Sequence, residues 1–259
     1  MDIKSVALDI FLDAIKSVQT ELVFNALVKW ENEHLIVGSK TYHLPIESNL
    51  YVIAAGKASC AMSQSMEKML GHRIHNGLCI TKKGHNLPLK YFKIIESGHP
   101  VPDEQSFEAG LEVNNLLKEV KKNDLVLVLL SGGASSLMMD FPVGLSKNDI
   151  KKVYDVLLKS GANISEMNLI RTALSKLKGG GMSKSVYPAT VVTLAISDVC
   201  GDQPEVIGSG PTVIHNKDSI TIQKVIDKYS LSKLLPAAVL KYLKEMAKKA
   251  PENQTFADQ

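Results

Sequence analysis

Apolar residues gather in short runs that have the length of β-strands. The longest runs lie in residues 50–55, 124–130 and 190–196, and two shorter ones lie at 77–81 and 93–96. In the second run, six consecutive apolar residues follow Asp124, which indicates a strand buried on both faces. Because helical stretches alternate with these runs, we expect an α/β fold, a mostly parallel sheet with helices on both faces.

Helical spacing fills most of the intervening segments. Asp103 is suited to cap a helix over 104–121, and Ser146 with Asp149 matches a capping box for a helix that Gly161 ends. Ser165 is predicted to cap the next helix, which would run to Leu177. Further helices are expected at 3–18, 21–30, 58–71, 219–229 and 236–249, with a hairpin at 35–44, a helical turn at 137–139 and a disordered tail at 251–259.

The central strand runs into a loop of small residues, Ser131-Gly132-Gly133-Ala-Ser135-Ser136. Glycine allows close approach to an anion, and backbone N–H groups at the start of a helix point toward it. Ligands of open α/β sheets bind beyond the carboxyl ends of the strands, where this loop would lie. A tight turn that joins two packed elements explains the same residues, so the phosphate-binding interpretation depends on the surrounding residues.

Reactive residues also follow two other predicted strands. Lys57 comes directly after the strand at 50–55, and Asp198 follows the strand at 190–196. If the strands are parallel, both ends open on the same side of the sheet as the glycine loop. A lysine at a helix start opposes the helix dipole, and a bound anion would relieve that conflict. The competing interpretations are a solvated lysine and, for the aspartate, an Asx turn.

Four further residues are candidates for the same chemistry. Asp198 and Asp202 bracket Cys200-Gly201 and predict a Mg²⁺ site, since carboxylates at a strand end hold this ion beside phosphates. His99 lies in a rigid Gly-His-Pro turn, and Arg171 with Lys178 precedes a glycine run in an arrangement that suits an anion clamp. A plain turn and surface charges account for these residues equally well.

Composition narrows the class of protein. The chain has 259 residues, 45% hydrophobic, with a net charge of +3 and three scattered cysteines that form no CxxC pair. These features predict a soluble cytoplasmic protein with reduced thiols, and they argue against a disulfide framework, a zinc site or a nucleic-acid partner. No apolar run approaches the ~20 residues of a membrane helix, and the N-terminus lacks a signal-peptide pattern.

Several catalytic motifs fail on spacing. No glycine stands at position 51 to make residues 51–58 a Walker A loop, and no GxGxxG follows a strand. The residues around Ser135 lack the last glycine of a hydrolase nucleophile elbow. A hydrolase that uses Ser135 with His99 and Asp198 therefore remains only a third hypothesis.

Six stretches, taken together, resemble the class II glycerate 2-kinases, the family with a MOFRL C-terminal domain. They are YVIAAGKA (51–58), ITKKGH (80–85), ESGHPVPDE (96–104), DLVLVLLSGGASSLM (124–138), SGANISEMNLIRTALSKLKGGGM (160–182) and VVTLAISDVCGDQPEVIGSGPTV (191–213). They occur in the family's order over roughly residues 10–240. The resemblance implies a Rossmann-like N-terminal domain and a smaller C-terminal domain, with the active site between them.

The same resemblance implies phosphoryl transfer from ATP, with Mg²⁺, to the 2-hydroxyl of D-glycerate. By position, Lys57 and Arg171 match cationic residues of the family, and Asp198 matches the aspartate of its SDV motif. Asp198 would position Mg²⁺ or the glycerate hydroxyl. The residues of the SGG loop, which would cradle phosphate, are Ser131, Gly132, Gly133 and Ser135, while His99 and Lys178 are further candidates for substrate or phosphate binding.

Two departures from the family qualify this expectation. Thr172 stands where the family usually has lysine, and family members usually run past 400 residues. We therefore expect residues 1–240 to form the Rossmann-like domain, with 241–259 as a helix end and tail and the second domain largely missing. The first hypothesis is a glycerate 2-kinase weakened by truncation, as a homodimer or with a separate C-terminal half. The alternative is a non-catalytic fragment that binds anions or glycerate.

Overall fold

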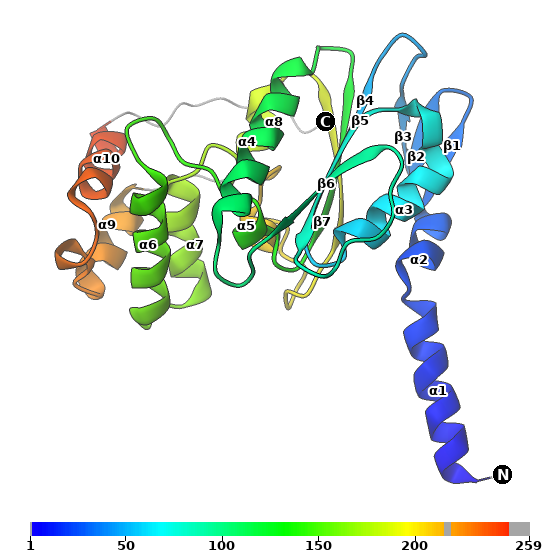
Figure 1. Cartoon of the computed structure of the whole chain (residues 1–259), viewed down its shortest axis with the longest axis horizontal. Coiled ribbons are helices and arrows are strands. Elements are labelled where there is room, and N and C mark those ends of the chain that lie inside the picture. Colours follow the sequence, from blue (N-terminus) through cyan, green and yellow to red (C-terminus); the bar gives the residue numbers. More distant parts are fainter. Residues whose placement is uncertain (1, 215–218, 249–259) are drawn as a thin grey trace.

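A five-stranded parallel sheet forms the centre of the computed structural model, which describes residues 2–214 and 219–248 (Figure 1). Its strands are β4 (Leu50–Ala55), β5 (Ile74–Lys82), β6 (Phe92–Ser97), β7 (Leu125–Ser131) and β8 (Thr190–Ile196). They lie in the order β6-β5-β4-β7-β8, every pair parallel. The chain thus winds outward from β4 in one direction and returns to continue from β7 in the other. This is the doubly wound, Rossmann-like arrangement, and it confirms the expected fold class.

Alternate residues of the sheet belong to different cores. Tyr51, Ile53 and Ala55 of β4 pack with α4 (Glu104–Glu119), α5 (Ala134–Leu137) and α8 (Gly181–Val186). The intervening residues of β4 pack on the other side with α2 (Thr20–Leu27) and α3 (Ser59–Leu70). Because successive strand residues point to opposite faces, this division explains why the predicted strands carry uninterrupted apolar runs.

The strand β8 departs from the prediction of a buried strand. It pairs only with β7, at the edge of the sheet, and of its seven residues only Val192 is buried. An apolar run predicts a strand, but the sheet order decides how many neighbours that strand has.

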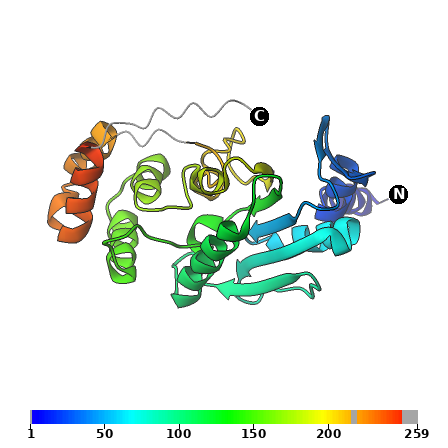
Figure 2. The same cartoon turned by 90° about the horizontal axis from the view of Figure 1, so that it is seen from above.

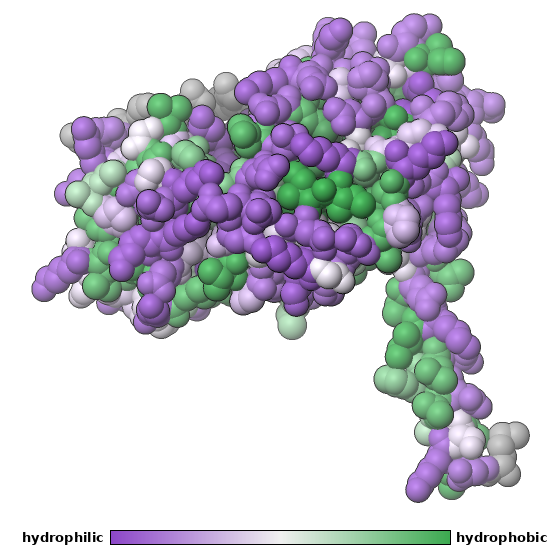
Figure 3. Space-filling model, in the orientation of Figure 1, coloured by the Kyte–Doolittle hydropathy of each residue, from purple (hydrophilic) through white to green (hydrophobic). Residues whose placement is uncertain are grey.

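The N-terminal region contains a small antiparallel sheet where a longer helix is predicted. The helix predicted at 21–30 ends at Leu27, and Trp30 lies in β1 (Val28–Glu31). This strand pairs with β2 (His34–Val37), which pairs with β3 (Lys40–His43) as the predicted hairpin. Buried Val28 opposite Val37 gives β1 a stronger preference for the sheet than its helical spacing gives it for the helix. Before it, α1 (Ile3–Ser17) projects from the body and exposes an apolar stripe (Figure 3).

Four helices build a separate apolar cluster at the end of the molecule away from the small sheet (Figure 2). They are α6 (Lys147–Lys159), α7 (Ile164–Ala173), α9 (Ser219–Lys228) and α10 (Ala237–Lys248), and Leu231 of the 3₁₀ turn η3 (Leu231–Lys233) joins the same cluster. Two further 3₁₀ turns, η1 (Gly71–Arg73) and η2 (Ile207–Ser209), lie elsewhere. Val239 and Leu243 of α10 pack in the same cluster, so this helix runs across the boundary expected after residue 240. The predicted tail at 251–259 lies outside the described residues.

Two helix predictions need correction. Asn163, not Ser165, caps α7, because its side chain accepts the backbone N–H of Glu166 while Glu166 caps back. That helix ends at Ala173 rather than Leu177, since the Asp140 carboxylate accepts the backbone N–H of Lys176 at 2.6 Å and that of Leu177 at 3.2 Å. The turn predicted at 137–139 begins earlier, as α5 (Ala134–Leu137). The predicted cap Asp103 of α4 and the predicted capping box of α6 are confirmed.

The cysteines give a direct test of the packing. Cys60 and Cys79 are buried with their Sγ atoms 3.3 Å apart, whereas Cys200 is exposed. The hydrogen bond from Cys79 lowers the pKa of Cys60 to about 7 and raises that of Cys79. Burial should nevertheless protect both, so we expect a thiol reagent to titrate one cysteine in the native protein and three in denaturant. Cys200→Ser should remove the native signal, and a second fast native thiol would contradict the packing.

Candidate functional site

The strand order places two loops side by side at the point where the winding direction reverses. The loop after β4 begins at Gly56 and the loop after β7 at Gly132, and β4 lies next to β7 in the sheet. Lys57 donates its backbone N–H to Gly132 O at 2.9 Å, and Ala58 donates its own to Ser131 Oγ at 3.0 Å. These bonds fix the two loops to each other, at the position where open α/β sheets hold their ligands.

Three side chains surround the glycines of the second loop. Gly133 is left-handed, with φ 94°, and a methyl group added to it would lie 2.9 Å from His99 Nε2 and 3.6 Å from Lys57 Cγ. A methyl group on Gly132 would overlap the carboxylate of Asp198. Lys57, His99 and Asp198 therefore meet at this loop, although they come from the ends of three different strands. The predicted convergence of strand ends is confirmed.

A further cation lies near His99, because Lys82 at the end of β5 pairs with Ser97 of β6, two residues before His99. Partial burial lowers the pKa of His99, the charges of Lys57 and Lys82 lower it further, and that of Asp198 opposes them. Lys82 ends β5 and was missed as a site residue, although it stands inside the ITKKGH stretch. Its position at the end of a predicted parallel strand is the feature of the sequence that could have identified it. The loop thus has two lysines, a carboxylate and an imidazole that favours its neutral form.

Acid titration should report this environment. Because the pKa of His99 is lower in the folded protein, the unfolded chain takes up the proton first as pH falls through about 6.5. The contribution of neutral His99 to stability is then present above this pH and lost below it. We expect His99→Asn to flatten the decline in melting temperature between pH 7.5 and 5.5. The exposed control His72→Asn should keep the wild-type slope, and an unchanged slope in both variants would contradict the assignment.

A chain of hydroxyl groups connects the loop with α7. Ser135 Oγ lies 2.8 Å from Ser209 Oγ, which lies 3.4 Å from Asn168 Oδ1. Ser209 is buried in η2, and neither Ser209 nor Asn168 was predicted from the sequence as a site residue. Because Ser209, and not His99, is the hydroxyl partner of Ser135, the structure offers no nucleophile–base pair for the hydrolase hypothesis.

Two predicted cations contact other parts of the protein. The Lys178 side chain is buried and donates from Nζ to Met138 O at 3.2 Å. The Arg171 guanidinium stacks on Tyr154, with its Cζ 4.5 Å from the ring centroid. These contacts hold both cations against the protein, and their role as an anion clamp stays a prediction.

The carboxylates offer limited support for a metal. Asp198 and Asp202 are exposed in the loop after β8, where Asp202 has a φ of 48° in a turn closed by its N–H and Val199 O. Across the residues that the structure describes, no three His, Cys, Asp or Glu side chains gather to hold a metal ion. Asp198 is the carboxylate beside the glycine loop. Such a site suits Mg²⁺, which often uses one or two carboxylates with substrate phosphates and water.

Comparison with known proteins identifies the family to which this chain belongs. The model described as "Domain of unknown function (DUF4147)" matches residues 6–244. The chain belongs to this family. It is 40% identical over 243 residues to a glycerate 2-kinase of Pyrococcus horikoshii, covering 92% of this chain and 53% of that protein. The resemblance to glycerate 2-kinases is confirmed.

Two further comparisons give other relatives. A putative hydroxypyruvate reductase of Agrobacterium vitis is 42% identical over 187 residues, which are 72% of this chain and 48% of that protein. The crystal structure of a glycerate kinase from Thermotoga maritima matches with a TM-score of 0.79 at 34% identity, covering 93% of this chain and 55% of that one. The chain therefore spans about half the length of the relatives it matches. No helix among the described residues has the length and apolarity needed to cross a membrane.

Proposed function

We propose that this chain carries the substrate- and phosphate-binding part of an ATP-dependent glycerate 2-kinase, which phosphorylates D-glycerate at its 2-hydroxyl. The observation that carries the proposal is the meeting of Lys57, His99 and Asp198 around Gly132 and Gly133 at the reversal of the sheet. The names of two relatives support the same reaction. The 2-position, ATP, Mg²⁺ and a cytoplasmic location all belong to this proposal.

Each residue has a role that its position suits. Lys57 and Lys82 attract the glycerate carboxylate and stabilise charge on the transferring phosphoryl group. Neutral His99 is able to accept the proton of the 2-hydroxyl, and Asp198 orients that hydroxyl or binds Mg²⁺. Bound Mg²⁺ would neutralise charge on the donor phosphates. Because Gly132 and Gly133 carry no side chains, Asp198 and His99 approach the loop closely, and a phosphate bound to the loop backbone would lie beside them.

Phosphoryl transfer also needs a cleft from which water is excluded, and this chain corresponds to about half of the kinases it resembles. The alternative function is accordingly a binding part that holds glycerate or phosphate and needs a complementary polypeptide for turnover.

The test is ADP release by the purified chain with Mg-ATP, with and without D-glycerate, together with the shift in melting temperature caused by each ligand. Glycerate-dependent ADP release supports the kinase. A thermal shift with D-glycerate but no turnover supports the binding part. Absence of both would refute the proposal. NADH oxidation with hydroxypyruvate, measured in parallel, tests the reaction named for the Agrobacterium relative.

A further inference from the structure

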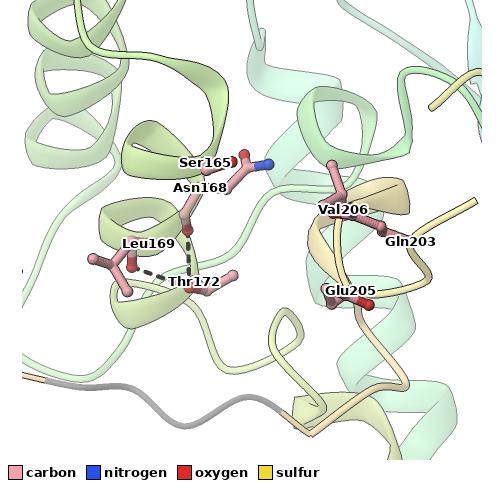
Figure 4. Close-up of a pocket in the computed structure, with 7 residues that line it drawn as sticks. All are labelled: Ser165, Asn168, Leu169, Thr172, Gln203, Glu205 and Val206. Atoms are coloured by element: carbon pink, nitrogen blue, oxygen red, sulfur yellow. Dashed lines mark hydrogen bonds between the residues drawn. The ribbon is translucent and has the colours of Figure 1, made fainter. Parts of the chain in front are cut away.

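A second site lies beside the glycine loop. A cavity of about 260 Å³ separates α7 from the loop that leads into η2 (Figure 4). Successive turns of α7 form one wall of the cavity, and residues just before η2 form the other. The lining residues are Ser165, Asn168, Leu169, Thr172, Gln203, Glu205 and Val206.

The cavity is connected to the loop that the proposed function assigns to phosphate. Asn168 lines the cavity and its Oδ1 lies 3.4 Å from Ser209 Oγ, which in turn lies 2.8 Å from Ser135 Oγ. Ser135 belongs to α5, the short helix that begins directly after Gly133. A ligand in the cavity would therefore lie next to any phosphate held at the glycine loop.

The lining chemistry differs from that of the loop. None of the seven lining residues is a lysine or an arginine. A phosphate or a carboxylate would find no cation in this lining, whereas Lys57 and Lys82 attract it at the loop. Hydroxyl groups of a sugar suit this lining, because a carboxylate is a common partner of ribose hydroxyls in nucleotide-binding α/β folds. Serine and amide side chains provide the donors and acceptors that a nucleobase edge needs.

Size supports a part of a ligand rather than the whole. Pockets for complete small molecules usually measure about 300–1,000 Å³, and this cavity falls just below that range. We propose that it binds the nucleoside, ribose and base, of the phosphate donor, while the phosphates of that donor extend to Gly132 and Gly133. This inference rests on the proposed function, and it adds where the nucleoside end of the phosphate donor binds.

The test compares ligands that represent the nucleoside, the phosphates or the acceptor alone with ATP, which combines nucleoside and phosphates. Binding of adenosine, ATP, tripolyphosphate and D-glycerate to the full chain is measured by calorimetry. Ser165 is exposed in the first turn of α7, at the rim of the cavity. The larger side chain of Ser165→Phe would fill the cavity. Ser39→Phe, in the exposed hairpin turn between β2 and β3, is the control for an added aromatic side chain.

We expect Ser165→Phe to weaken adenosine and ATP on the order of tenfold or more, with tripolyphosphate and D-glycerate unchanged. The control should bind all four as the wild type does. Equal ATP affinity in wild type and Ser165→Phe would overturn the nucleoside site, as would failure of adenosine and ATP to bind the wild type. Selective loss of D-glycerate in Ser165→Phe would overturn it as well and assign the cavity to the acceptor. Because D-glycerate and tripolyphosphate report the loop independently, the proposed function can stand while this inference fails.

Discussion

Replacing Lys57 with alanine is expected to lower kcat on the order of 10²–10³-fold, the cost of losing one group that stabilises transition-state charge. The side chain lies against Gly133 and beside His99, and its charge contributes to the low pKa of that histidine. The measurement is the rate of glycerate-dependent ADP release. If turnover requires a complementary polypeptide, the same substitution should still abolish the thermal shift that D-glycerate or tripolyphosphate produces.

Two controls separate the site role from a general charge effect. Lys118→Ala removes an exposed lysine of α4 and should leave rate and binding unchanged. Lys57→Ala should also let the pKa of His99 rise toward its ordinary value, which NMR titration of the imidazole would show. A wild-type rate in Lys57→Ala would refute the role of this lysine.

Replacing Gly56 with alanine is expected to destabilise the fold by at least about 3 kcal/mol, the sum of backbone strain and overpacking. Its φ of 134° is one that only glycine adopts readily, and a methyl group would overlap Ser131 Oγ and lie 2.5 Å from Ser131 O. The substitution would push apart the two loops that hold the candidate site. Denaturant unfolding gives the change in free energy.

Gly38 is the matched control. It has a φ of 57° and no atom within 4 Å of an added methyl group, so Gly38→Ala has the backbone cost without the collision. We expect it to cost about 1–2 kcal/mol. If both variants lose the same free energy, the close approach of the two loops contributes nothing to stability.

Part of the site could be predicted from the sequence, because apolar runs show where strands end. The apolar runs before Lys57, Ser131 and Asp198 predict strands, and parallel strands bring their carboxyl ends to one side. Lys178 shows where this reasoning stops. Its position before a glycine run predicts an anion clamp, but only the folded chain shows that its ammonium is buried and donates to Met138 O.

The sequence by itself determined the α/β class, the strands of the central sheet and most helix starts, because apolar period and capping residues act within a few positions of the chain. Tertiary structure decided the order of the strands, the conversion of residues 28–30 from predicted helix to strand, and the exposure of β8 at the sheet edge. It also decided that Lys82 joins the site and that Asn168 approaches Ser135 through Ser209. These outcomes depend on contacts between residues far apart in the chain, which no local pattern contains.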